Sequence, residues 1–277
     1  MLKCIDHSVA FCHNACQALK AMQRIFPCEK ELMHQIPLLK IVQTYRQQLQ
    51  QQKQPFLIRV AGQSGSGKSS QLVPALEEVL QSKSYVKISV GMFAPFHPNY
   101  DIWQKSSPSQ MRERTNGFAL RALYLFYCYC IKNRVNILLD MTLLEPEIEY
   151  YFAFLAKCQG YHVMLHVLAV PKKVSDFFIH KRQCQTGRCV SPQSAQYFFS
   201  ALPRALKSLL HLPVWIKSDQ IWLWTHNQMS PLMRTTFFNS HVMHVFAKAQ
   251  RNRQINKKEK CLLAAKKRVL RYFVEAL

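Results

Sequence analysis

Apolar positions along the chain follow two spacings. Short continuous apolar runs of strand length occur at 56–61, 85–90, 135–139, 162–170 and 216–224. Apolar residues recur every three or four positions at 72–80, 118–132, 147–159 and 171–210, the last with a break near 186–192. Strands that alternate with helices are typical of a parallel sheet covered on both faces. The pattern therefore predicts an α/β fold with a mainly parallel sheet flanked by helices.

The two ends of the chain differ from this pattern. Residues 1–54 carry helical periodicity that ends in a Gln-rich run, and the stretch from Phe246 is helical and strongly basic. We therefore predict a helical N-terminal segment over 1–54, an α/β domain over 55–240 and a basic helical segment over 241–277.

The loop after the first predicted strand carries the most specific motif. Its sequence GQSGSGKS fits G-x-x-x-x-G-K-[ST] and precedes a predicted helix, which is the context that a phosphate-binding loop requires. Lys68 is expected to reach the β- and γ-phosphates and Ser69 to ligate Mg²⁺. The predicted nucleotide-binding residues are Gly62, Gln63, Ser64, Gly65, Ser66, Gly67, Lys68, Ser69 and Ser70.

Three charged residues are further candidates. Asp140 ends a buried strand, where α/β sheets bind ligands, so it is expected to hold Mg²⁺ or accept a proton; the alternative is a cap on the next segment. Arg182 and Arg188 are placed to neutralise a transferred phosphoryl group. The alternative is that both arginines belong to the general excess of solvated basic side chains.

Composition narrows the classes of protein to which the chain can belong. The 277 residues hold 37 Lys+Arg against 15 Asp+Glu, a net charge of +22, which favours a polyanionic partner or substrate. A hydrophobic fraction of 49% excludes intrinsic disorder.

No run is long and uncharged enough for a transmembrane helix, and no signal peptide precedes the domain, so a cytoplasmic location is expected. The cysteines are expected as free thiols; a zinc site at Cys12, His13 and Cys16 lacks paired ligand spacing.

Several motifs in fixed order resemble the zeta toxin family over residues 38–225. They are Gly62–Ser69, His97–Tyr100, Asn136–Thr142, Ala169–Lys172, Arg182 and Ser191–Ala195. The resemblance implies a P-loop kinase-like three-layer fold. It also implies a kinase that uses ATP or GTP with Mg²⁺ to phosphorylate the 3′-hydroxyl of UDP-N-acetylglucosamine, held inactive by an antitoxin helix near the nucleotide site.

The resemblance also assigns roles to individual residues. It implies catalytic roles for Lys68, Asp140, Arg182 and Arg188, a metal site at Ser69 and Asp140, and an acceptor site that includes His97, Thr142 and Tyr124. Two positions depart from the family pattern. The catalytic aspartate falls on Gly91, and an acidic residue on the acceptor side falls near Tyr124. These departures imply a changed acceptor, a base relocated to Asp140 or Asp101, or lost catalysis.

These departures leave two functions open. The first is a phosphotransferase that acts on a small, nucleotide-sugar-like acceptor. The second is a catalytically attenuated nucleotide-binding protein that acts as a switch or binds a polyanionic partner. The basic C-terminal segment can lie on an anionic membrane or nucleic acid, but a terminal helix packed by its apolar face is favoured.

Overall fold

The computed structural model describes Lys20 and residues 36–106, 108–143, 146–186, 190–212, 217–225, 233–235 and 240–251. These residues form a sheet in the order β2-β3-β1-β4-β5-β6. The first five strands of this order are parallel, and β6 runs antiparallel to β5. The strands are β1 (Phe56–Gly62), β2 (Val86–Ser89), β3 (Ile137–Asp140), β4 (His162–Leu168), β5 (Gln220–Trp224) and β6 (Met233–Thr235). The prediction of a mainly parallel sheet is confirmed.

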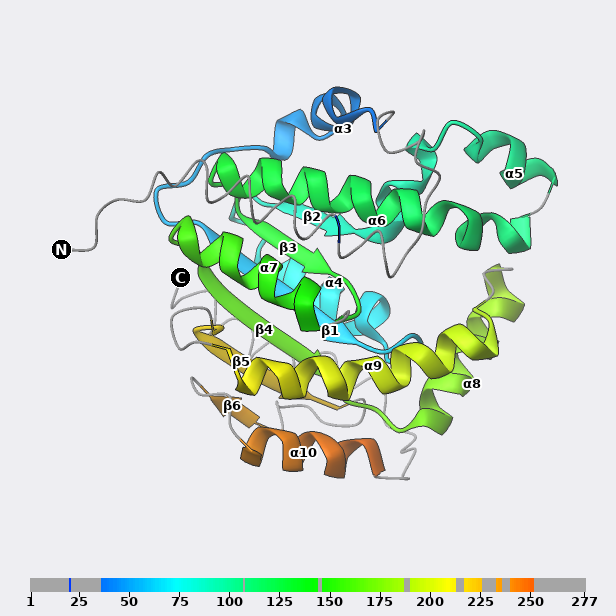
Figure 1. The fold of residues 1–277 in the computed structure, drawn as a ribbon, viewed down its shortest axis with the longest axis vertical. Coiled ribbons are helices and arrows are strands. Elements are labelled where there is room, and N and C mark those ends of the chain that lie inside the picture. Colours follow the sequence, from blue (N-terminus) through cyan, green and yellow to red (C-terminus); the bar gives the residue numbers. More distant parts are fainter. Residues whose placement is uncertain are drawn as a thin grey trace.

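Helices cover both faces of this sheet, as Figure 1 shows. The helices are α3 (Leu38–Thr44), α4 (Val73–Val79), α5 (Tyr100–Ser106), α6 (Pro108–Lys132), α7 (Pro146–Cys158), α8 (Lys172–Thr186), α9 (Pro192–Leu210) and α10 (Ser240–Arg251). Helices α6, α7 and α9 lie on one face, and α4 lies on the other. This arrangement is the three-layer architecture expected from the sequence.

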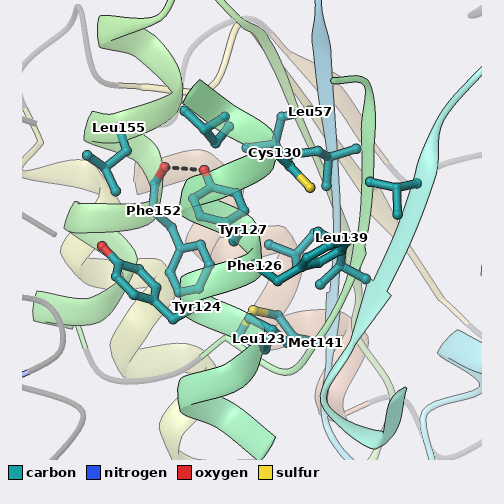
Figure 2. Packing of buried hydrophobic residues seen from close by; sticks show 14 of the residues in the cluster. Leu57, Leu123, Tyr124, Phe126, Tyr127, Cys130, Leu139, Met141, Phe152 and Leu155 are labelled. Atoms are coloured by element: carbon teal, nitrogen blue, oxygen red, sulfur yellow. Dashed lines mark hydrogen bonds between the residues drawn. The ribbon is translucent and has the colours of Figure 1, made fainter. Parts of the chain in front are cut away.

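The period of two along each strand divides the core between these layers. Odd-numbered residues of β1 and β4 pack against the α6, α7 and α9 layer, whereas even-numbered residues face α4. Figure 2 shows the join of α6 and α7, where the Tyr127 hydroxyl donates to the carbonyl oxygen of Phe152 at 2.7 Å. By the same alternation Asp140 shares the α4 face with Leu138, which directs its side chain towards the start of α4.

Some element boundaries differ from the predictions. Helix α6 begins ten positions before the predicted 118–132, because its first turns are polar and give no apolar periodicity. Strand β6 and helix α5 were not predicted, and α10 begins before Phe246. Helix α3, within the predicted N-terminal segment, buries Ile41 completely in the core shared with α6. The domain boundaries stay predictions, and the basic segment beyond Arg251 lies outside the described residues.

A buried ion pair joins the central strand to α7. Arg59, in β1, is 2% exposed and pairs with Glu149, which is 0% exposed. Burial lowers the pKa of Arg59 to about 10, so the guanidinium stays charged at neutral pH. An ion taken out of water costs several kcal/mol unless its partner is close and well oriented.

We expect Glu149→Ala to lower the free energy of unfolding by about 3 to 5 kcal/mol, because Arg59 is left buried without its carboxylate. Denaturant unfolding followed by circular dichroism measures this loss. The matched control is Glu77→Ala, which breaks a half-exposed pair with Lys87 of 2.9 Å. That pair should contribute about 1 kcal/mol or less. Equal losses in the two variants would show that burial of the Arg59 pair carries no special cost.

Candidate functional site

The phosphate loop, Gly62–Ser69, connects β1 to α4 at the carboxyl end of the sheet. Gly65 and Gly67 adopt left-handed backbone conformations with φ of 74° and 93°, which few other residues tolerate. A wide π-helical turn, Lys68–Leu72, then leads into α4, and Pro74 in the first turn of α4 has no N–H to tighten it. The glycines of the motif therefore shape the turn that a phosphate-binding loop needs.

The side chain of Lys68 folds back onto the first residues of the loop. Its ammonium group donates to the carbonyl oxygen of Gly62 at 2.5 Å and to that of Gln63 at 3.1 Å. These contacts hold the charge beside the loop backbone, where an anion bound by the loop would meet it.

Ser69 and Asp140 meet across the sheet edge. The Ser69 hydroxyl donates to Oδ2 of Asp140 at 2.9 Å, and Asp140 is only 8% exposed. Mg²⁺ prefers oxygen ligands and is usually bound by one or two of them together with substrate phosphates. The two residues predicted for the metal site are therefore brought together, and their chemistry fits Mg²⁺.

The loop also holds buried polar atoms whose hydrogen-bonding capacity is not used. Ser66 Oγ and Gln63 Oε1 are buried, and neither has a hydrogen-bond partner within the part of the chain that the structure describes. Buried polar groups normally find partners, so such atoms mark a place where a ligand or water completes the hydrogen bonding. The Ser66 hydroxyl can donate to a phosphate oxygen, which fits a phosphate-bearing ligand in the loop, whereas Gln63 Oε1 can only accept and needs a water or another donor.

Helix α8 packs against the phosphate loop from the other side. A Cβ atom added at Gly65 would lie 2.3 Å from the backbone oxygen of Ser175 and 3.0 Å from the side chain of Ile179. Arg182 lies further along α8 and is half-buried. The second predicted arginine, Arg188, lies outside the described residues.

The three residues predicted to contact the acceptor differ in burial and position. His97 is 3% exposed, its ring contacts Trp103 and Phe118, and its Nδ1 accepts the N–H of Asn99 at 3.0 Å. These contacts fix the turn that starts α5. Thr142 is half-buried and follows Asp140 by two residues at the sheet edge.

Tyr124 lies in the core instead. Its side chain is 0% exposed, and its ring meets that of Phe152 edge-on with the centroids 5.1 Å apart. Figure 2 shows the two side chains beside each other. Burial raises the pKa of its hydroxyl. Tyr124 packs between α6 and α7 with no exposed surface, which does not fit the acceptor contact predicted for it.

Gly91 lies at the same edge as Asp140. It belongs to a 3-10 turn, Val90–Met92, directly after β2, and Ser89 at the end of β2 pairs in register with Asp140. Gly91 is exposed, and its φ is not positive, so this backbone accepts a larger residue. Neither sequence nor structure places a carboxylate at this position.

Neither clustered metal ligands nor a membrane-spanning helix is found among the described residues. No cluster of three or more potential metal ligands occurs there, and the residues of the alternative zinc site, Cys12, His13 and Cys16, lie outside them. Where the chain is described, none of its helices combines the length and the apolar character needed to cross a membrane.

Comparisons with known proteins agree with this geometry. The family model described as Zeta toxin matches residues 42–228. Toxin PezT of Streptococcus pneumoniae serotype 4 (strain ATCC BAA-334 / TIGR4) is 28% identical over 123 residues, 44% of this chain and 48% of that protein. The match thus spans about half the length of this curated relative.

A solved structure shows the same fold. It comes from a study of the PezAT chromosomal toxin-antitoxin system of Streptococcus pneumoniae and superposes with a TM-score of 0.65 at 18% identity. The superposition covers 91% of this chain and 100% of that chain. At this identity the likeness shows the fold alone.

The geometry of the loop predicts that Lys68→Ala weakens nucleotide binding at least tenfold, because a charge-assisted contact to phosphate contributes about 1.5 to 3 kcal/mol. Calorimetry with ATP and Mg²⁺ measures this change. Lys83→Ala removes the same charge from an exposed position and serves as control. Equal affinity in Lys68→Ala and Lys83→Ala, with unchanged folding, would contradict the assignment.

Proposed function

Because the chain belongs to the zeta toxin family, which consists of nucleotide-dependent kinase-like toxins, we propose a specific phosphotransferase activity for it. The protein transfers the γ-phosphoryl group of ATP or GTP, with Mg²⁺, to a hydroxyl of a small nucleotide-sugar-like acceptor. The observation that carries this proposal is the 2.9 Å contact of Ser69 with Asp140, directly beside Lys68 of the phosphate loop.

Each residue has a role in this proposal that its position supports. Lys68 binds the β- and γ-phosphates, and Ser69 with Asp140 holds Mg²⁺, which neutralises phosphate charge when bound. Arg182 approaches the terminal phosphate from α8, and Thr142 faces the acceptor beyond Asp140. Phosphoryl transfer depends mainly on positioning and electrostatics, which these groups supply.

The group that takes the proton from the acceptor hydroxyl is the least defined part of the proposed site. Gly91 has no carboxylate, and Asp101 is exposed in the first turn of α5. Asp140 already accepts a hydrogen bond from Ser69 through Oδ2. We therefore assign Asp140 to the metal first and to the acceptor proton second. The missing base favours the alternative function, a nucleotide-binding switch with attenuated catalysis.

An inhibitory protein partner is part of the proposal. The solved structure with the same fold comes from a toxin-antitoxin system, in which a second protein is paired with the toxin. We infer that an antitoxin-like protein restrains this chain as well. An anionic partner for the basic segment 241–277 is the alternative to a packed terminal helix, and the residues beyond Arg251 lie outside the described part of the chain.

Incubation of the purified protein with γ-labelled ATP or GTP, Mg²⁺ and a panel of UDP-sugars tests the activity. Transfer of label to an acceptor, absent in Lys68→Ala, supports the phosphotransferase. Tight nucleotide binding without transfer to any acceptor supports the switch.

Asp140→Asn is expected to lower transfer about a hundredfold or more, because the amide keeps the shape of the carboxylate and loses its charge. A Mg²⁺ titration of the transfer rate measures the loss of metal dependence. Asp101→Asn is the matched control. If Asp140→Asn keeps its rate while Asp101→Asn loses it, the role belongs to Asp101.

Gly91→Asp is expected to raise turnover on UDP-N-acetylglucosamine, because a positioned base contributes about 10² to 10⁴ in rate. The exposed position and the ordinary φ of Gly91 make the substitution compatible with the fold. The control is Gly91→Asn, because asparagine has the shape of aspartate but cannot act as a base. A gain in Gly91→Asp that is absent in Gly91→Asn is therefore due to the base and not to packing. No gain in a stable Gly91→Asp protein would show that the acceptor differs or that none exists.

A further inference from the structure

Gln63 of the phosphate loop makes a contact that nucleotide binding alone does not require. Its side chain is 1% exposed, and its amide Nε2 donates to the carbonyl oxygen of Val170 at 2.6 Å. Val170 lies between the end of β4 and the start of α8. The side chain of Gln63 therefore ties the loop to the segment from which α8 begins.

A second contact joins the same two elements. Gly65 approaches α8 so closely that any Cβ would overlap the backbone oxygen of Ser175, at 2.3 Å. A side-chain rotation cannot relieve a contact between two stretches of backbone, so the loop is held at one point just before α8 and at a second point within its first half.

Arg182 lies on the face of α8 that makes this contact. Ser175, Ile179 and Arg182 follow an i, i+4, i+7 spacing, which places them on one side of a helix. Ser175 and Ile179 are 3% and 8% exposed and both lie beside Gly65. By this spacing the Cβ atom of Arg182 lies on the side of α8 that faces the phosphate loop and tilts towards the start of the helix.

We propose that Gln63 is a positioning residue for Arg182, an inference that rests on the proposed binding of a nucleoside triphosphate. By fixing the start of α8 to the phosphate loop, Gln63 sets the distance from the Arg182 guanidinium to the terminal phosphate. A displacement of about 1 Å is enough to weaken such a contact strongly. Gln63 thus contributes to the preference for triphosphate over diphosphate.

A double-mutant cycle measures this coupling. The variants are Gln63→Met, Arg182→Ala and the pair, with calorimetric affinities for ATP and ADP in Mg²⁺. Methionine keeps the length of glutamine and removes its hydrogen bonds. We expect Gln63→Met to lower ATP affinity about three- to tenfold and ADP affinity less than about twofold. In the Arg182→Ala background, Gln63→Met should change ATP affinity less than about twofold.

Two results would overturn the inference. One is an equal loss of ATP and ADP affinity in Gln63→Met, and the other is an additive effect with Arg182→Ala, both of which indicate a role for Gln63 in the loop alone. Gln81→Met, at an exposed position, is the control for the substitution itself. Both results come from nucleotide affinities measured without an acceptor. A protein that binds nucleotide but transfers no phosphoryl group therefore still tests the coupling between Gln63 and Arg182.

Hydrogen exchange tests the tie in the nucleotide-free protein. Gln63→Met should raise the exchange of the backbone amides of 176–182 several-fold, whereas Gln81→Met should not. Unchanged exchange in α8 would overturn the inference even if the protein bound no nucleotide.

Discussion

The parallel pairing of β1 with β3 is the constraint on which the site depends. Val60 and Asp140 are partners in this register, and the phosphate loop begins two residues beyond Val60. Because parallel strands end at the same edge, the pairing delivers the loop and the carboxylate to one place. Pairing of β2 with β3 then brings Gly91 to the same edge. A register shift of one residue would turn Asp140 away from Ser69 to the opposite face.

The central strand also carries the least expected residue of the core. Arg59 faces α7, and its pair with Glu149 places a charged group where an apolar residue would be easier to bury. Such a pair adds little net stability, but it penalises every arrangement in which α7 moves along the sheet. Since α7 follows the segment that contains Thr142, the pair also restricts where that segment runs.

Periodicity and one motif were enough to predict the layers, the strands before and after the phosphate loop, and the Ser69–Asp140 neighbourhood. The prediction failed where local signals are weak: the polar first turns of α6 have no apolar stripe, and β6 has only three residues. Tyr124 shows a different limit. A family position predicts a site contact, but only packing against Phe152 reveals that the side chain is enclosed. The bridge from Gln63 to Val170 joins residues 107 positions apart, and no sequence pattern marks it.

The charges of the site are unevenly distributed between its two halves. In the proposed nucleotide half, Ser69 contacts Asp140 and Lys68 contacts the loop backbone, whereas the position proposed for the acceptor base holds the exposed Gly91. A base contributes about 10² to 10⁴ in rate, while enzymes accelerate reactions by about 10⁶ to 10¹⁷. Loss of the base therefore lowers the rate but leaves part of the acceleration that a phosphoryl-transfer site can supply. The absence of a carboxylate at Gly91 mainly changes which acceptor hydroxyl can react. The rate of transfer falls least for a hydroxyl that is already acidic or that is held against Asp140.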